Sequence, residues 1–154
     1  SLVGSEMCIR DRTWTVPTGW EEKAASGMRI ATFAAKDDRA AIDCSIVTLG
    51  SGAGGLSANI IRWLGQLYIT VPPEKELTSF VENLEKISLP GGLTSLVVDF
   101  SSFQKDVASE SPSMLAAIID TPQQRIFVKM TGSKANIAKH SASFKSLVQS
   151  MEFH

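Results

Sequence analysis

Apolar and polar residues alternate over several short stretches of this chain, a pattern typical of strands that bury one face. The alternation predicts strands over residues 13–16, 28–35, 42–49, 93–100, 114–119 and 125–130. A charged turn at residues 36–39 separates the second from the third, and Thr-Pro-Gln-Gln at residues 121–124 separates the last two. Because proline favours a tight turn there, we expect two antiparallel hairpins.

Helical spacing of apolar residues marks three other stretches. We expect a helix over residues 58–67 capped by Ser57, and a second over residues 74–87, which follows two prolines and has acidic residues in its first turn. Ser133 is expected to cap a third helix. The stripe of this third helix is Ile137, Ser141, Phe144, Val148 and Met151.

The order of these elements indicates the fold class. Three strands precede two helices, and three further strands precede the last helix. Separate runs of strands and helices favour an α+β fold with a mainly antiparallel sheet, and helices on both faces would make it a three-layer α/β/α sandwich. Trp14 and Trp20 are candidate core anchors, and the polar residues 101–112 are expected to form a flexible loop.

Composition adds limits but no activity. The 154 residues are 44% hydrophobic and 20% charged, which is the balance of a single folded domain. The formal net charge of −1 argues against a protein built mainly to hold nucleic acid or an anionic membrane surface. No apolar run reaches the roughly 18 residues that a membrane span needs.

The start of the chain, residues 1–12, resembles translated sequencing-adaptor sequence and shows no sustained periodicity. We therefore treat residues 1–12 as a non-native or disordered leader, and residues 13–154 as one domain. Cys8 then falls outside the natural protein. On this interpretation the natural N-terminus is missing, and an export signal or a lipid-attachment cysteine would have been there. A periplasmic or membrane-anchored location therefore stays open.

The sequence offers little for catalysis or metal binding. His140, His154 and Cys44 are too few and too scattered for a zinc site, and no G-x-S-x-G elbow is present for a serine hydrolase. Cys44 lies in a predicted strand, where a buried inert thiol is expected, and His140 is expected to be a solvated helix residue. We expect no catalytic residue, metal or cofactor. The lysines of the third helix are expected to form a solvated face: Lys134, Lys139 and Lys145.

Gly50, Gly52 and Gly55 satisfy G-x-G-x-x-G between a predicted strand and a predicted helix. Such a loop can bring backbone N–H groups to a phosphate at the positive end of a helix. A dinucleotide-binding unit also needs an acidic residue about 20 residues on, at the end of a second parallel strand, whereas Glu74 and Glu76 lie beside two prolines at the start of a helix. Two interpretations stay open, a tight strand-to-helix turn or an anion site.

On the first predicted helix the residue types divide into two arcs. One arc is apolar: Ile60, Ile61, Leu64, Leu67 and Tyr68. The other carries Asn59, Arg62, Trp63 and Gln66. Because a wet tryptophan forfeits burial energy, either Trp63 packs against another segment or it is an exposed contact residue. In the first case Arg62 and Asn59 would bond to carbonyls of the glycine loop, and Trp63 would cover the sheet edge.

Four segments together carry a family resemblance: WTVPTGW at 14–20, MRIATF at 28–33, GAGGLSANIIRWLGQL at 52–67 and SFKSLVQSMEF at 143–153. They resemble a group of bacterial proteins, often exported and often lipoproteins, with a PsbP-like fold. That fold is shared by an extrinsic photosystem II subunit and a small Ran-GTPase-binding protein. The resemblance implies an α/β/α sandwich used as a noncatalytic binding or assembly module. The chain departs from the group at residues 68–71, where a glycine- or leucine-rich link is usual.

The resemblance supplies binding positions but no catalytic ones. They are Asn59, Arg62, Trp63 and Gln66, with Gly52, Gly54 and Gly55 of the loop. The hypothesis is therefore a noncatalytic domain of an exported bacterial protein that binds a protein or a cell-envelope component through this helix face. The alternative is a module for a small anion or nucleotide-like ligand that uses residues 50–55 and Arg62. An unrecognised hydrolase is a third possibility.

Overall fold

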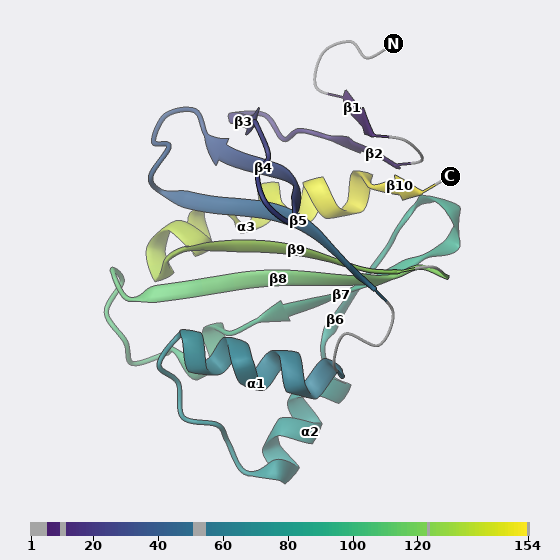
Figure 1. The fold of residues 1–154 in the computed structure, drawn as a ribbon. Coiled ribbons are helices and arrows are strands. Elements are labelled where there is room, and N and C mark those ends of the chain that lie inside the picture. The colour runs from purple at the N-terminus through teal and green to yellow at the C-terminus, as the bar shows by residue number, and fades with distance from the viewer. Residues whose placement is uncertain (1–5, 10–11, 51–54, 123, 154) are drawn as a thin grey trace.

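A seven-stranded antiparallel sheet lies between two layers of helix (Figure 1). The computed structural model describes residues 6–9, 12–50, 55–122 and 124–153. Its elements are β1 (Glu6–Ile9), β2 (Arg12–Thr15), β3 (Trp20–Lys23), β4 (Arg29–Ala35), β5 (Ile42–Gly50), α1 (Leu56–Gln66), α2 (Glu74–Glu82), β6 (Glu85–Ser88), η1 (Pro90–Gly92), β7 (Thr94–Asp99), η2 (Ser101–Phe103), β8 (Pro112–Asp120), β9 (Gln124–Ser133), α3 (Lys134–Ser150) and β10 (Glu152–Phe153). The strand order in the large sheet is β3-β4-β5-β9-β8-β7-β6.

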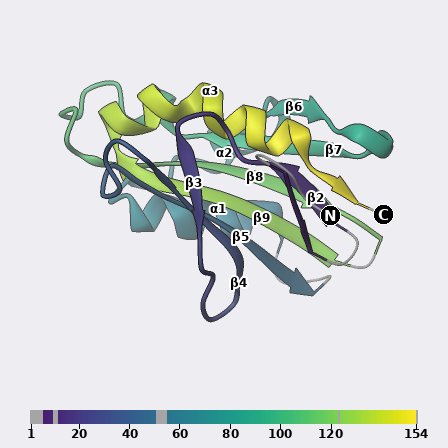
Figure 2. The same cartoon turned by 90° about the horizontal axis from the view of Figure 1, so that it is seen from above.

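The large sheet consists of two meanders, β3-β4-β5 and β6-β7-β8-β9, joined where β5 pairs with β9. This joining ladder runs from Ile42 opposite Gly132 to Gly50 opposite Gln124. Helices α1 and α2 connect the meanders across one face, while α3 packs on β8 and β9 from the other face (Figures 1 and 2). Both expected hairpins, β4-β5 and β8-β9, and the three-layer α+β architecture are confirmed.

Each face of the sheet has its own apolar core. The α3 side includes the expected anchors Trp14 and Trp20, which are 1% and 3% exposed. The α1/α2 side is built around Trp63 and Phe100. Seven consecutive residues of β8 are buried because both of its faces are covered. Full burial of a large apolar side chain contributes about 1.5–3 kcal/mol, so these two cores are the main stabilising force.

Short edge strands are the elements that the sequence pattern missed. The predicted helix over 74–87 is wrong at its end, because α2 stops at Glu82 and Glu85–Ser88 forms β6. Leu84 packs in the α1/α2 core, whereas Ile87 packs against the α3 core. A continuous helix would keep both side chains on one stripe, so the chain has to change to a strand between them. Strand β3, which begins at Trp20, was not predicted.

The ends of the other helices give one correction and one confirmation. Helix α1 begins at Leu56 with Gly55 as its N-cap, so Ser57 is not the cap. Helix α3 has the expected cap, because the backbone N–H of Asn136 donates to Ser133 Oγ at 3.1 Å. On α3, His140 is 9% exposed and lies beside Trp20, so its expected solvation is wrong.

Segments expected to lack regular structure are partly ordered. Glu6–Ile9 forms β1, which pairs with β2, and β10 pairs with the opposite side of β2. No element had been predicted before Thr13; that residues 1–12 are foreign to the natural protein stays a prediction. Within the expected flexible loop 101–112, Gln104 is 1% exposed. Its amide accepts from Ser113 Oγ at 2.6 Å and donates to the Pro112 carbonyl, which ties the loop to β8.

The C-terminus of α1 places a tyrosine in a position that favours glycine. The N–H of Ile69 donates to the Leu64 carbonyl at 2.9 Å, and the N–H of Tyr68 donates to the Gly65 carbonyl at 3.1 Å. This is the Schellman arrangement, whose left-handed residue here is Tyr68 with φ of 60°. Tyr68 was expected on the apolar arc of the helix, yet it is 89% exposed, so burial does not offset the strain.

We expect Tyr68→Gly to raise the free energy of unfolding by about 0.5–1 kcal/mol, because glycine adopts this conformation without a Cβ clash. Urea denaturation monitored by circular dichroism measures the change. Tyr68→Ala removes the same exposed ring but keeps the strain, and it should leave stability nearly unchanged. Equal stabilisation by both variants would show that the ring, and not the backbone, carries the cost.

Candidate functional site

Two helices cannot cover one whole face of the sheet. Seven strands at a spacing of ~4.8 Å span about 29 Å, whereas two packed helices of ~10 Å each span about 20 Å. The face is apolar on the covered strands, where it carries Ala116 and Phe127. On β4 and β5 it carries Thr32 and Ser45, which pair with each other across the ladder. Beside α1 this face has no helix over it, and we call the part formed by Thr32, Ser45 and Val47 the polar strip.

Trp63 packs against the sheet and is not an exposed contact residue. It is 2% exposed, and its ring meets Phe127 of β9 edge-on, with centroids 5.6 Å apart and planes at 78°. The expected arcs of α1 are rotated, because its buried residues are Asn59, Ile60, Trp63 and Leu64. Ile61, expected on the buried arc, is 39% exposed. Of the two interpretations of Trp63, packing against the sheet is the one the structure shows.

Asn59 is fully buried and holds Arg62. Its Nδ2 donates to the Gly55 carbonyl at 3.0 Å, and its Oδ1 accepts from Arg62 Nη2 at 2.6 Å. Asn59 thus bonds to the loop end as expected, whereas Arg62 bonds to Asn59 and not to a loop carbonyl. Both polar ends of the buried amide are used, so the guanidinium has a fixed partner on the exposed flank of α1.

Gln66 joins the same flank to the sheet, because its Oε1 accepts from Lys129 Nζ at 3.1 Å. Lys129 lies on β9 between Ser45 of β5 and Ala116 of β8, at the border between the polar and apolar parts of the face. Of the four residues predicted on the helix, two are therefore buried and two are exposed. Asn59 and Trp63 are buried supports, while Arg62 and Gln66 face the polar strip.

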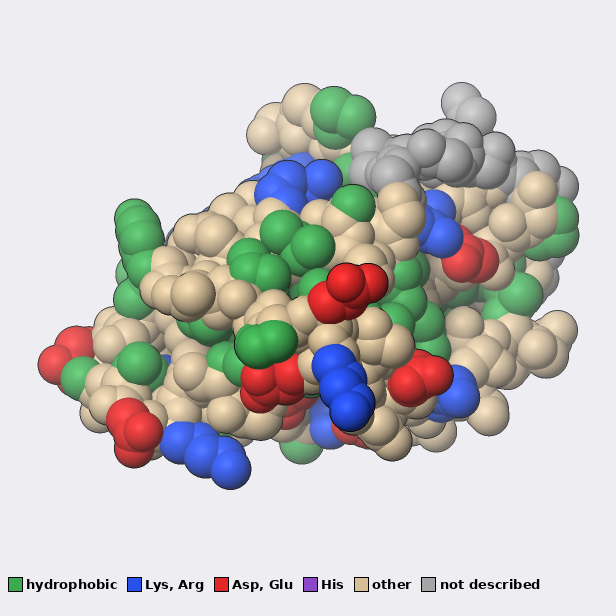
Figure 3. All heavy atoms as spheres, turned by 90° about the horizontal axis from the view of Figure 1, so that it is seen from below, with side chains coloured by type: hydrophobic (Ala, Val, Ile, Leu, Met, Phe, Trp, Pro, Cys, Tyr) green, Lys and Arg blue, Asp and Glu red, His purple; other side chains and the backbone are tan. Residues whose placement is uncertain are grey.

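A pocket of about 360 Å³ lies between this flank and the strip. Its charged residues are Arg29, Asp43, Arg62 and Lys129, and we call it the cation pocket. Arg29 holds Asp43 through two bonds of 3.0 and 2.8 Å. Arg62 and Lys129 form no ion pair with any other described residue, and their partners are neutral amide oxygens. The pocket thus has three cations and one carboxylate, an excess of positive charge. Elsewhere on the α1/α2 side of the molecule, acidic and basic side chains lie close together (Figure 3).

The electrostatics of Lys129 reflect this excess. Burial lowers the pKa of its ammonium, and the nearby Arg62 and Arg29 lower it further, while Asp43 acts in the opposite direction. The pKa of Asp43 is itself held below its ordinary value by the hydrogen bond from Arg29. The charged form of Lys129 is therefore under-compensated, and an anion in the pocket would stabilise it.

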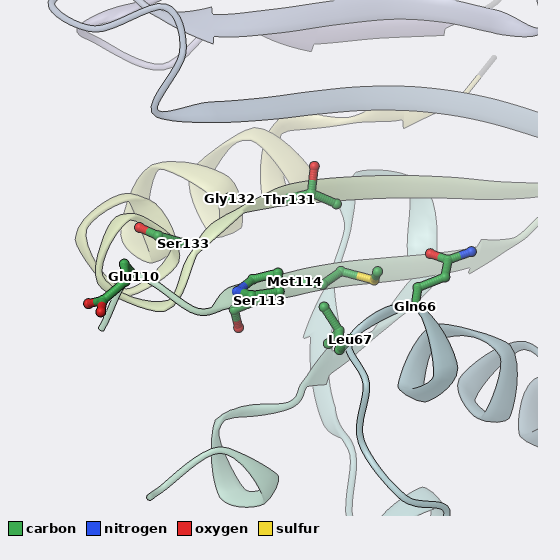
Figure 4. A pocket seen from close by; sticks show the side chains of 9 residues that line it. Gln66, Leu67, Glu110, Ser113, Met114, Thr131, Gly132 and Ser133 are labelled. Atoms are coloured by element: carbon green, nitrogen blue, oxygen red, sulfur yellow. The ribbon is translucent and has the colours of Figure 1, made fainter. Parts of the chain in front are cut away.

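A second pocket, of about 460 Å³, adjoins the cation pocket, with Thr131 and the neighbouring α1 flank at the junction. Leu67 and Met114 lie toward one another in its middle, with Gln66 at one end and Glu110 at the other (Figure 4). We call it the Leu67 pocket. Together the two pockets form a groove along β9 beside α1.

Sequence reasoning missed Arg29, Asp43 and Lys129. A signal for Lys129 exists, since Ile126, Val128 and Met130 alternate into the α3 core and leave residue 129 on the opposite face. That it meets Arg29 and Arg62 depends on strand order, which the pattern does not contain. Gly52 and Gly54 of the glycine loop lie outside the described residues, and Gly50 ends β5.

Other candidate groups are separate from the pocket. Cys44 is fully buried, and burial raises the pKa of its thiol, as expected for an inert residue. The α3 lysines have separate partners: Lys134 donates to loop carbonyls, Lys139 Nζ lies 3.9 Å from Asp37 Oδ2, and Lys145 pairs with Glu85. Within the described ranges, no group of His, Cys, Asp or Glu could hold a metal ion. No helix there has the length and apolar character to cross a bilayer.

We expect Arg62→Gln to raise the pKa of Lys129 toward its ordinary value, because a neighbouring positive charge is removed while a donor to Asn59 is kept. An NMR pH titration of the lysine side-chain resonances measures it. Arg39→Gln, which breaks an exposed pair with Glu21, is the matched control and should leave Lys129 unchanged. An unchanged pKa in Arg62→Gln would contradict the cation pocket.

Comparisons with known proteins concern the fold. No protein family and no curated protein matches the sequence. Among solved structures, the chain is similar to the solution structure of cyanobacterial PsbP (CyanoP) from Synechocystis sp. PCC 6803. The identity is 12%, the similarity covers 94% of this chain and 87% of CyanoP, and the TM-score is 0.52. Similarity at this identity transfers architecture and not activity. The expected architecture is thereby confirmed, and the chain has a PsbP-like fold.

Proposed function

We propose that the domain is a noncatalytic binding module that holds a carboxylate of a partner protein in the cation pocket. The observation that carries this proposal is the pairing of Arg62 and Lys129 with neutral amide oxygens inside a concave site. A PsbP-like fold is consistent with a noncatalytic binding domain. Asp43 is paired with Arg29, so the partner supplies the negative charge for Arg62 and Lys129.

Each pocket residue has a distinct part in this binding. Arg62 and Lys129 donate charge-assisted hydrogen bonds to the carboxylate, each worth about 1.5–3 kcal/mol. Asn59 and Gln66 orient these two cations, and Trp63 forms the apolar wall. Since Asn59 and Trp63 are already buried, little side-chain entropy is lost on their account when the partner binds.

The geometry favours binding over reaction. A general acid–base pair needs a carboxylate within reach of the proton that it transfers. Asp43 is the carboxylate of the pocket, and both of its oxygens accept from Arg29. Asp43 is thereby committed to an ion pair, and Lys129 has an amide and not a base as its partner.

The biological setting belongs to the same proposal. The resemblance of residues 14–20, 28–33, 52–67 and 143–153 to exported bacterial lipoproteins supports an exported protein and a partner in the cell envelope. The coding sequence upstream of residue 13 tests this part. A signal peptide or a lipid-attachment cysteine there would support export, and a cytosolic leader without either would contradict it.

A second candidate function is the binding of a small free anion, such as phosphate or a nucleotide-like ligand. The same pocket favours it, because its volume of about 360 Å³ matches a small ligand. This candidate would also use residues 50–55, of which Gly55 is the N-cap of α1. Titration with phosphate in parallel with acetate distinguishes the two: a much stronger response to phosphate favours the free anion.

Lys129→Met should separate binding from stability. Removing an under-compensated cation should raise the free energy of unfolding by about 0.5 kcal/mol, a small gain because solvent still reaches the half-buried ammonium. The same variant should lose the acetate-induced shifts of the pocket amides in ¹H–¹⁵N NMR spectra. Lys75→Met on the exposed side of α2 is the control and should retain them. Destabilisation with unaltered acetate shifts would overturn the proposed role.

Asn59→Ala tests the positioning of Arg62. Loss of a buried amide should lower the free energy of unfolding by about 1–2 kcal/mol and also weaken acetate binding, because Arg62 loses its partner. Asn83, the C-cap of α2, makes the same type of bond, from Nδ2 to the carbonyl four residues earlier, but is exposed. Asn83→Ala should therefore cost about 0.5 kcal/mol or less and leave acetate binding unchanged. A purely structural Asn59 would lower stability without weakening the binding.

A further inference from the structure

The groove formed by the cation pocket and the Leu67 pocket has a charged end and an apolar end. One end carries Arg29, Arg62 and Lys129, and the middle of the other pocket carries Leu67 and Met114. Thr131 lines both pockets, so the two are continuous along β9. A single carboxylate would occupy one end and leave the apolar end without a contact.

The spacing of the two ends follows from the strand register. Lys129 pairs across the ladder with Ala116, and Thr131 pairs with Met114. Residues two apart on a strand lie about 6.7 Å from one another on the same face. The same spacing separates alternate side chains of any extended peptide that lies along β9. An extended segment can therefore place one side chain at Lys129 and the next but one over Met114.

Charge restricts what such a segment can carry. Glu110 lines the far end of the Leu67 pocket and would repel a second acidic side chain there. Leu67 and Met114 are 7% and 1% exposed at the bottom of this pocket, and Pro112 beside them is exposed, so these three apolar side chains form no hydrogen bonds there. The groove thus selects an acidic residue at one position and an apolar residue two positions away.

Resting on the function proposed above, we propose that the partner contributes an extended segment with alternating acidic and apolar side chains. Its carboxylate lies in the cation pocket, and its apolar side chain lies in the Leu67 pocket. Affinity then comes from both ends of the groove, with each end weak by itself. This names the class of partner as a polypeptide, in preference to a free anion.

Three capped synthetic peptides test the inference with ¹⁵N-labelled protein in NMR titrations. The first, acetyl-Gly-Leu-Ser-Glu-Ser-Leu-Gly-amide, has an apolar residue on each side of the acid and so fits in either chain direction. The second replaces the glutamate with glutamine, and the third replaces both leucines with serine. We expect the first to bind at least fivefold more tightly than either of the others, with shifts at Leu67, Met114 and Lys129.

The outcomes distinguish this inference from the proposed function. If the serine peptide binds as tightly as the leucine peptide, the Leu67 pocket takes no side chain and the inference is overturned, while carboxylate binding stands. If no peptide binds but acetate still shifts the pocket amides, the inference again fails alone. If acetate also has no effect, the proposed function fails with it. Binding of the glutamine peptide at equal affinity would likewise overturn the inference.

A variant of the protein gives an independent test. Thr131 is half-exposed at the junction of the pockets, and a phenylalanine is compatible with its strand position. Thr131→Phe should reduce leucine-peptide affinity at least fivefold by filling the groove, while acetate still binds at Lys129. Thr78→Phe on the exposed side of α2 is the control and should bind the peptide normally. Unaltered peptide binding by a folded Thr131→Phe protein would contradict the groove.

Discussion

The mismatch between a seven-stranded sheet and the two helices on one of its faces determines the chemistry of this protein. On that face β4 and β5 carry Thr32 and Ser45, together with Val47, beside α1. Lys129 lies at the border, between Ser45 and Ala116. A cation at such a border is neither fully solvated nor paired with an acid, and this intermediate state makes the pocket receptive to an anion.

The contacts that anchor α1 also set the geometry of the pocket. Trp63 rests edge-on against Phe127, and Asn59 bonds to the carbonyl that precedes the helix, so the helix cannot rotate without losing core contacts. Arg62 and Gln66 follow on the exposed flank of the same turns. The side chains proposed to bind are thus positioned by packing and by a buried amide.

The sequence predicted the layers of the fold more completely than the site. The long hairpins and α3 were predictable because each carries its own period and its own turn or cap, as Ser133 does. Edge strands β3 and β6 span four residues each, too short to establish a period against competing helical spacing. The helix was predicted, but the sequence left open whether Trp63 packs or is exposed, and it placed Asn59 opposite the apolar arc. Their burial depends on Phe127 and Gly55, and Lys129 meets Arg62 only because β5 and β9 are neighbours.

The composition of the cation pocket also bears on which anion it prefers. Asp43 remains in the pocket as the partner of Arg29, so every anion that enters meets one negative charge as well as three positive ones. Repulsion from Asp43 doubles for a phosphate dianion relative to a carboxylate, although attraction to the cations doubles too. Arg62 has five N–H donors and Lys129 has three, and each spends one of them on an amide oxygen. The remaining donors suffice for the oxygens of either group. The neutral amides therefore orient the two cations without excluding either anion.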